Sequence, residues 1–250
     1  MNGIIIVNKP AGWTSFDVVA KIRNLTGTVK VGHSGTLDPI ATGVLPVFLG
    51  MATKMIKYFL NGDKGYEAEM VLGARTDSGD ATGKFQNSNL QLPNSKQMPI
   101  TITKEQIESA MNKYRGEIMQ TPPMFSAVKI KGQRLYELAR KGIEVKREAR
   151  KITIYALRLT YYDMQDPTAP KVAFDMLCSK GTYVRQLVMD VGDDLGCGAY
   201  LTRISRTYSQ PFHISQALNL ETIVTMAKAD VLASVVLDPA EIMAEMKKGG

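Results

Sequence analysis

The segment Gly32–Pro46 contains residue types that could do acid–base or nucleophilic chemistry. It holds Asp38, one of the two histidines of the chain (His33) and three glycines, and it lies between apolar runs. The runs are typical of strands, and the glycines and prolines between them indicate a loop. Because loops held by rigid strands often carry catalytic groups, Asp38 is the first candidate. The alternative is an ordinary Asp-Pro turn, in which the carboxylate accepts hydrogen bonds from nearby amides.

The composition restricts the chemistry that could accompany this carboxylate. The chain has 250 residues, of which 44% are hydrophobic, and only two cysteines, Cys178 and Cys197, with no C-x-x-C spacing. With so few Cys and His side chains, a nitrogen- or sulfur-ligated metal site is not expected. No G-x-G-x-x-G, P-loop or G-x-S-x-G motif occurs, so we expect neither a nucleotide cofactor nor a serine hydrolase. We therefore expect an enzyme without cofactor or metal.

A single carboxylate limits the reaction types further. It can act as a nucleophile or as a general base, whereas glycoside hydrolysis normally needs two carboxylates. The chain is also basic, with a net charge of +7 and a pI near 9.3. A basic, cofactor-free protein with one reactive carboxylate favours isomerisation on a nucleic acid, which needs neither redox change nor net water.

The positive charge is concentrated in one segment. Residues 129–151 contain nine Lys or Arg and three Glu, together with Tyr136 and several apolar residues. Such a segment favours a polyanion, and its apolar residues predict that it folds and does not trail as a tail. The alternative is a solvated helix face.

Hydrophobic periodicity predicts an α+β protein. Strands are expected at 3–7, 29–32, 44–49, 66–72, 150–163 and 170–178. Helices are expected from a Ser15 cap with Phe16, Val19, Ile22 and Leu25 inward, and at 52–60, at 104–114 capped by Thr103, and at 183–195 with Val184, Leu187, Val188 and Val191 inward. Residues 77–80 predict a turn and 84–102 an exposed connection. The absence of a repeating βαβ unit argues against a doubly wound sheet.

Four ordered motifs resemble those of the bacterial tRNA pseudouridine-55 synthases. They span residues 3 to about 215. The motifs are Val7-Asn8-Lys9-Pro10-Ala11-Gly12-Trp13-Thr14-Ser15, Gly32-His33-Ser34-Gly35-Thr36-Leu37-Asp38-Pro39 with Gly43 and Leu45-Pro46, Pro122-Pro123-Met124-Phe125-Ser126-Ala127-Val128-Lys129 with Gly132, Tyr136, Ala139-Arg140 and Gly142, and Ser179-Lys180-Gly181-Thr182-Tyr183-Val184-Arg185.

The resemblance implies a mixed, mainly antiparallel sheet flanked by helices and crossed by a catalytic cleft. It also implies conversion of one T-loop uridine of tRNA to pseudouridine, in which the N1–C1′ bond breaks, the uracil turns and C5 joins C1′. Asp38 then corresponds to the family's essential aspartate. Three routes are open: attack on C1′, addition to the base, or removal of the 2′ proton.

The resemblance also implies roles for other residues. Arg185 is expected to pair with Asp38, and Tyr66 to stack on the extruded uracil. The alternatives are a surface helix charge for Arg185 and a core aromatic for Tyr66. His33 is expected to occupy the space left by the flipped nucleotide and not to act as a general base.

Further site residues follow from the same motifs. Lys9 is expected to position the N-terminal motif or to contact phosphate, the alternative being a surface lysine. Tyr183 is expected to line the pocket with Leu187, while an RNA contact by Asp80 is a looser inference. The RNA backbone is expected to meet Lys129, Lys131, Arg134, Arg140, Lys141, Lys146 and Arg147.

The expected domain organisation is a catalytic domain over residues 1–237, with a short tail at 238–250. Family members usually continue there into a small RNA-binding domain of the PUA type. The N-terminus reaches Asn8 too soon for a signal peptide and no apolar run approaches membrane-spanning length, so we expect a cytoplasmic protein.

The expected partner is the T-arm stem-loop of tRNA, bound by a monomer without guide RNA or membrane. One alternative is a guide-RNA-dependent synthase of the archaeal and eukaryotic type, which shares the aspartate motif but relies on accessory proteins. The other is a non-catalytic tRNA-binding protein, against which the set Asp38, Tyr66 and Arg185 argues.

Overall fold

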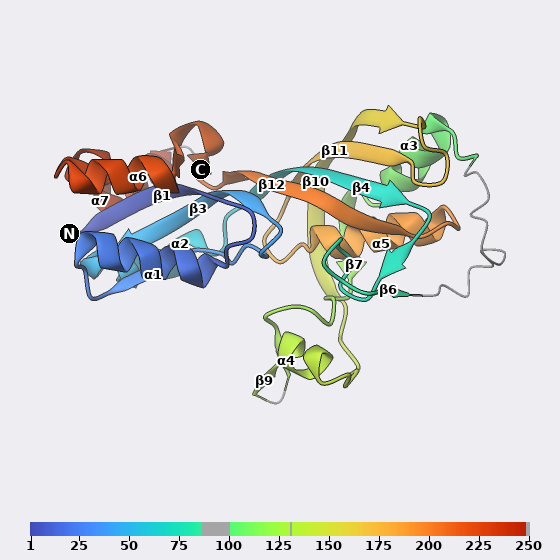
Figure 1. The fold of residues 1–250 in the computed structure, drawn as a ribbon, viewed down its shortest axis with the longest axis horizontal. Helices are drawn as coiled ribbons and strands as arrows, with labels where there is room; N and C mark the ends of the chain where they lie inside the picture. The colour runs from blue at the N-terminus through green and yellow to red at the C-terminus, as the bar shows by residue number, and fades with distance from the viewer. Residues whose placement is uncertain (87–100, 131, 249–250) are drawn as a thin grey trace. The chain divides into compact units, whose positions relative to one another are not determined.

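The computed structural model describes residues 1–86, 101–130 and 132–248. The chain forms two compact units: unit 1 comprises Met1–Tyr66 and Ile204–Gly250, and unit 2 comprises Glu67–Arg203 (Figure 1). Strands β4 (Lys64–Leu72) and β12 (Ala199–Ser209) each contribute to both units. Every other strand and helix of the described residues belongs to one unit, so the two are described separately.

Unit 1 is built around two long antiparallel strands, β1 and β3. Its strands are β1 (Gly3–Lys9), β2 (Val31–His33), β3 (Thr42–Leu49), β13 (Phe212–His213) and β14 (Leu218–Asn219). Strand β14 is parallel to β1, while β3 pairs antiparallel with β2 near its C-terminal end and parallel with β12 near its N-terminal end. The loop between β2 and β3 therefore starts next to Val47 of β3, the pairing partner of His33, and ends at Thr42, where β3 begins.

The helices of unit 1 cover these strands. They are α1 (Ser15–Thr26), α2 (Ile56–Phe59), α6 (Leu220–Lys228) and α7 (Pro239–Lys248), with 3-10 turns at Gly50–Met55, Ile214–Gln216 and Leu232–Val235. One apolar cluster joins alternate residues of β1 and β3 to α2 and α7: Ile4, Ile6, Val44, Phe48, Ala52, Phe59, Phe212 and Ile242. The segment expected to be a short tail thus forms a helix whose Ile242 packs in this cluster.

The start of α1 differs from the expected one. Thr14 is the N-cap, and it forms a capping box with Asp17. Ser15 lies inside the helix, where its hydroxyl bonds to the backbone of Leu37, so the predicted Ser15 cap is wrong. The predicted burial of Phe16 is also wrong, because at 3.6 residues per turn it lies on the opposite side from the buried Val18 and is 69% exposed.

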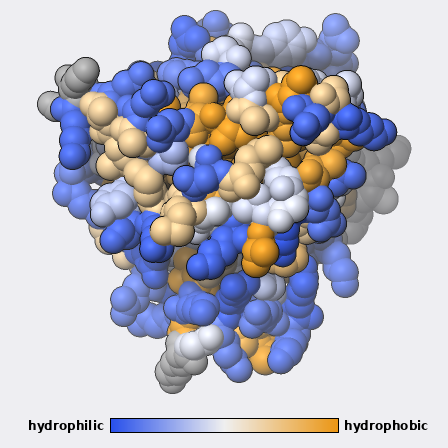
Figure 2. All heavy atoms as spheres, turned by 90° about the vertical axis from the view of Figure 1, so that its left-hand side faces the viewer, coloured by the Kyte–Doolittle hydropathy of each residue, from blue (hydrophilic) through white to orange (hydrophobic). Residues whose placement is uncertain are grey.

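Figure 2 shows apolar side chains (orange) interspersed with hydrophilic ones (blue) over its visible face. Phe16 and Val29 are among the exposed apolar residues of unit 1.

The strand expected from Val29 begins at Val31. The helix expected at 52–60 is divided into a 3-10 turn and the short α2, because the Ile56 amide donates to the Thr53 carbonyl three residues before it.

Unit 2 contains the antiparallel pairs β10–β11 and β10–β7, with strand order β12-β4-β11-β10-β7. Its other strands are β5 (Arg75–Thr76), β6 (Phe85–Gln86), β7 (Gly116–Gln120), β8 (Lys129–Ile130), β9 (Gln133–Arg134), β10 (Arg150–Asp163) and β11 (Lys171–Cys178). Its helices are α3 (Lys104–Asn112), α4 (Leu135–Arg140) and α5 (Val184–Asp194).

Most expectations for unit 2 are confirmed. The long strands at 150–163 and 170–178, the turn at 77–80, the Thr103 cap of α3 and the buried face of α5 all form. Of the connection expected at 84–102, residues 87–100 lie outside the described residues. The mixed, mostly antiparallel sheet with flanking helices confirms the α+β prediction.

The basic segment also folds as expected. It lies in the part of unit 2 that connects β7 to β10 and contains the β8–β9 hairpin and α4 (Figure 1). Leu135 and Leu138 are buried, while Lys129, Arg134 and Arg140 are exposed. The amphipathic pattern of this segment therefore orders a small structure that displays positive charge.

Candidate active site

The loop that carries Asp38 is anchored to unit 1 from several sides. The Ser15 hydroxyl accepts a hydrogen bond from the Leu37 amide at 2.8 Å and donates to the Leu37 carbonyl at 3.3 Å. The Pro39 carbonyl accepts from the Gly12 amide at 2.8 Å, and the Asp38 carbonyl accepts from the Ala41 amide at 3.0 Å. The backbone on both sides of Asp38 is thus held by the segment that begins α1.

Lys9 is fully buried beneath this loop. Its ammonium donates to the carbonyls of Trp13 at 2.6 Å, Pro10 at 2.9 Å and Pro39 at 3.4 Å. Burial lowers the pKa of Lys9 to about 8, and the nearby Asp38 charge partly offsets that effect. The alternative of a surface lysine is therefore wrong, and the contacts support the expectation that Lys9 positions the N-terminal motif.

Arg206 is a buried charge that the sequence analysis did not select. Only 2% of it is exposed, and its guanidinium donates from Nε to the Val44 carbonyl at 2.8 Å and from Nη2 to the Gly35 carbonyl at 3.0 Å. Burial lowers the pKa of Arg206, and the electrostatic interaction with Tyr66 opposes that shift. The sequence signal that could have identified Arg206 is strand alternation, which places its side chain on the same buried face as Ile204.

His33 lies at the end of β2, where the Asp38 loop begins. Its Nδ1 is buried and has no hydrogen-bond partner among the described residues. Burial, and secondly the Arg206 charge, lower the pKa of His33. The imidazole is therefore neutral near pH 7, and its expected role beside a flipped nucleotide stays a prediction.

Arg185 is a second buried guanidinium, located in unit 2. Its Nε lies 3.6 Å from the Asp80 carboxylate, and both side chains are only 6% exposed. Its terminal nitrogens donate to the Ser78 carbonyl at 2.8 Å and the Phe125 carbonyl at 2.7 Å. The alternative of a surface helix charge is therefore wrong. The expected pairing of Arg185 with Asp38 joins residues of different units and stays a prediction.

Asp80 has a structural setting that the sequence did not indicate. Its carboxylate accepts hydrogen bonds from the Ser78 hydroxyl at 2.9 Å and from the Thr82 amide at 2.9 Å and hydroxyl at 2.6 Å. The residue is 5% exposed. This carboxylate therefore orders the 77–80 turn and faces Arg185, and its expected RNA contact stays a prediction.

Tyr183 is the N-cap of α5, and Leu187 lies on the first turn of the helix with Arg185. The side-chain amide of Gln120 accepts from the Tyr183 amide at 2.8 Å and donates to the Tyr183 carbonyl at 3.1 Å, which fixes the start of the helix. Leu187 is 1% exposed and lines a small apolar cavity with Met70 and Phe174. Their expected contacts with substrate stay predictions.

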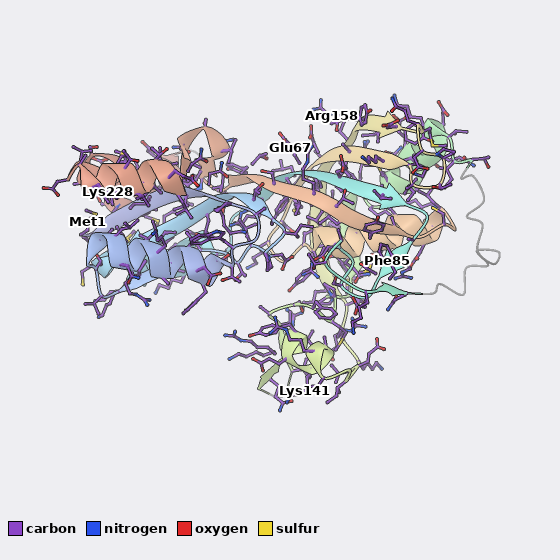
Figure 3. All side chains as sticks on the ribbon, in the orientation of Figure 1. Met1, Glu67, Phe85, Lys141, Arg158 and Lys228 are labelled. Atoms are coloured by element: carbon purple, nitrogen blue, oxygen red, sulfur yellow. The ribbon has the colours of Figure 1, made fainter. Side chains whose placement is uncertain are left out.

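The residues expected to meet the RNA backbone are mostly exposed. Five of the seven are exposed: Lys129, Arg134, Arg140, Lys141 and Lys146. Lys141 is labelled in Figure 3. The guanidinium groups of Arg134 and Arg140 lie over the Tyr136 ring. Arg147 is partly buried and bonds to Glu144 and to the Pro122 carbonyl, while Lys131 lies outside the described residues.

Among the described residues, no group of three or more His, Cys, Asp or Glu side chains could hold a metal ion. Over the same residues, no helix is both long and apolar enough to cross a membrane.

The sequence and fold are similar to those of known pseudouridine synthases. Residues 23–184 match the model of the TruB family pseudouridylate synthase (N terminal domain). The chain is 46% identical over 223 residues to "tRNA pseudouridine synthase B" of Clostridium tetani, covering 89% of this chain and 73% of the relative. It is 41% identical over 246 residues to the protein of that name from Geobacter sulfurreducens, covering 98% and 77%.

A solved structure supports the same assignment. The "Crystal Structure of a Cbf5-Nop10-Gar1 Complex" contains a chain that matches 94% of this one with a TM-score of 0.70 and 29% identity. This chain spans 60% of the length of that solved chain. The family match covers more than half of the sequence, including Asp38 and Tyr66. The chain belongs to the TruB family of pseudouridylate synthases.

Proposed function

We propose that this protein is a tRNA pseudouridine synthase that isomerises the T-loop uridine at position 55, with Asp38 as the catalytic residue. The observation that carries the proposal is the 46% identity to a tRNA pseudouridine synthase B, which extends over 89% of the chain and includes the Asp38 loop. The reaction breaks the N1–C1′ bond, forms the C5–C1′ bond and moves one proton from C5 to N1. It is balanced without cofactor or water.

The anchoring of the Asp38 loop supports this role. A reacting carboxylate must be held in place while the target base leaves the RNA stack, which costs a few kcal/mol. Ser15 and Gly12 hold the backbone next to Asp38, and the buried ammonium of Lys9 places a positive charge near its carboxylate. Tyr66 on β4 would provide the stacking surface for the uracil.

A stand-alone tRNA enzyme is favoured over a guide-RNA-dependent one. The relatives named for tRNA are 41% to 46% identical to this chain, whereas the chain from the Cbf5-Nop10-Gar1 complex is 29% identical. We therefore propose that the T-arm stem-loop binds without guide RNA or accessory protein. A monomer in the cytoplasm stays a prediction.

The deciding experiment incubates the purified protein with an unmodified T-arm stem-loop and no other component, followed by chemical mapping of pseudouridine. Modification at the single T-loop uridine is expected.

Asp38→Asn should lower the single-turnover rate by at least about 1,000-fold and leave RNA affinity within about twofold. The matched control is Asp175→Asn, which removes a partly exposed carboxylate of β11. Wild-type turnover by Asp38→Asn would refute the assignment of Asp38.

The basic segment is proposed to bind the RNA backbone. Arg140, Lys141 and Lys146 are exposed, so replacing all three by Gln should weaken T-arm binding and reduce the slope of log K against log salt by about one per lost phosphate contact. Lys228→Gln, which removes an exposed cation of α6, serves as the control. An unchanged slope in the triple variant would exclude this segment as an RNA contact.

A further inference from the structure

We propose that Arg206 is a positioning residue that holds both ends of the Asp38 loop and the Tyr66 hydroxyl in one geometry, an inference that rests on the proposed function. Arg206 lies on β12, outside the loop and outside the family match at residues 23–184. All of the contacts described below lie within unit 1.

The guanidinium joins the two ends of the loop. Nη2 donates to the Gly35 carbonyl, before Asp38, and Nε donates to the Val44 carbonyl, after it. Because the guanidinium is planar and rigid, these bonds fix the separation and direction of the two carbonyls together. A flexible ammonium could satisfy either carbonyl but would not hold both in this way.

Two glycines, Gly35 in the loop and Gly43 at the start of β3, show how closely Arg206 approaches. Gly43 has a φ of 101°, and a Cβ built there would lie 2.3 Å from the Arg206 carbonyl oxygen. Gly35 has a φ of 100°, and its Cβ would lie 3.4 Å from Nη1 of Arg206. The backbone of Arg206 therefore contacts one end of the loop and its side chain contacts the other.

The same guanidinium interacts electrostatically with the side chain of Tyr66, on β4. One side chain thus connects the aspartate loop with the residue proposed to stack on the uracil. A shift of Arg206 would move the loop and Tyr66 together, and displacements of about 1 Å can cost about 100-fold in rate.

Stability alone does not account for this arrangement. Among the described residues no carboxylate forms an ion pair with Arg206, which is 2% exposed and is bonded to neutral acceptors. Burying a charge without a counter-ion is unfavourable, and an apolar side chain of similar volume often gives a more stable protein. A rigid fork that fixes several acceptors is, however, what a catalytic loop requires.

The test compares Arg206→Lys with Arg203→Lys, which changes an exposed arginine of the same strand. We expect Arg206→Lys to keep T-arm affinity within about twofold and to lose about 100-fold in single-turnover rate, measured where both proteins are fully folded. Hydrogen exchange of residues 34–44 should become faster, while that of α5 in unit 2 stays the same. The control should match the wild type in every measurement.

A double-mutant cycle separates positioning from general loss of structure. If Arg206 acts through Tyr66 and the loop, Tyr66→Phe and Arg206→Lys together should cost much less than the product of their separate rate losses. Multiplicative losses, or a wild-type rate in Arg206→Lys, would overturn the inference. If Arg206→Lys does not fold, Tyr66→Phe provides the test, because faster exchange in 34–44 supports the inference and unchanged exchange overturns it.

The wild-type assay distinguishes failure of the proposed function from failure of the positioning role proposed for Arg206. A wild-type protein that forms no pseudouridine on the T-arm contradicts the proposed function. The exchange of residues 34–44 in Arg206→Lys then still decides whether Arg206 holds the loop.

Discussion

The two units each bury an arginine, but they stabilise it in different ways. In unit 2 the Arg185 guanidinium lies 3.6 Å from the Asp80 carboxylate and also donates to backbone carbonyls. In unit 1 Arg206 donates to the carbonyls of Val44 and Gly35 and interacts electrostatically with Tyr66. In unit 2 a carboxylate neutralises the buried charge, whereas in unit 1 backbone carbonyls solvate it.

The positive character of unit 1 has consequences for its other titratable groups. Lys9 is buried nearby, and the Arg206 charge contributes to the lowering of its pKa and that of His33. The negative charge of a carboxylate such as Asp38 is opposite to the charges of Lys9 and Arg206. Unit 2 thus holds its arginine by charge pairing, while unit 1 buries the cations Lys9 and Arg206 in the unit that carries Asp38, the residue proposed to react.

The largest expected effect tests the charge pairing in unit 2. Asp80→Asn removes the carboxylate facing Arg185 and should lower the free energy of unfolding by about 3 to 5 kcal/mol, because the guanidinium is left buried without it. Denaturant titration measures this change. Asp175→Asn breaks the exposed pair with Arg158, labelled in Figure 3, and should cost less than about 1 kcal/mol. Equal losses in the two variants would remove the distinction between buried and exposed pairing.

A second prediction tests the positive environment of unit 1. The pKa of Lys9 is about 8 in the folded chain and 10.5 in the reference state, so the unfolded chain binds more protons between these values. The free energy of unfolding of the wild type should therefore rise with pH from about 8 to 10.5, by up to about 3 kcal/mol relative to Lys9→Met. Urea titrations of both proteins across this range measure the difference.

The same titrations also show how this prediction could fail. Parallel pH profiles for wild type and Lys9→Met would mean that the folded chain does not lower the pKa of Lys9. Lys228→Met provides the control, because that lysine is exposed on α6.

The smallest effect compares the helix caps of the two units. Thr14 caps α1 in a box with Asp17, and Thr103 caps α3 in a box with Gln106. Replacing either threonine by Ala should cost about 1 kcal/mol at pH 7. The pKa of Asp17 is lowered by its bonds to Thr14, so the cost at Thr14 should be fully present above pH 3.8 and decrease as pH falls below it.

The cost at Thr103 should not follow this profile, because the side chain of Gln106 does not titrate. Thermal unfolding of both variants between pH 3 and 7 distinguishes the two cases. Identical profiles would show that the charge of Asp17 adds nothing to the cap.

The accuracy of the sequence-based predictions depended on whether the signal was local. Long apolar runs, as at β10, β11 and β1, and the Thr103 cap were predicted because each depends on neighbouring residues. The Ser15 cap was wrong because the Ser15 hydroxyl bonds to Leu37, which is distant in the sequence. Local propensity cannot identify a partner that only the fold supplies.

The candidate site shows the same division. Asp38 and its loop were identified from residue type, spacing and family resemblance, since glycines and prolines define a loop locally. The burial of Lys9 and the Asp80–Arg185 pair were not predicted, because exposure and contacts between distant segments have no local signature.

The sequence by itself determined the α+β class, the Asp38 loop, the basic segment and the family. These follow from periodicity and motifs, which are properties of the chain order. Only the tertiary structure decided that Arg206 holds Gly35 and Val44, and that Lys9 is buried beneath the Asp38 loop. The reason is physical: a buried charge must find acceptors, and the ones available to it are set by which strands the fold brings together.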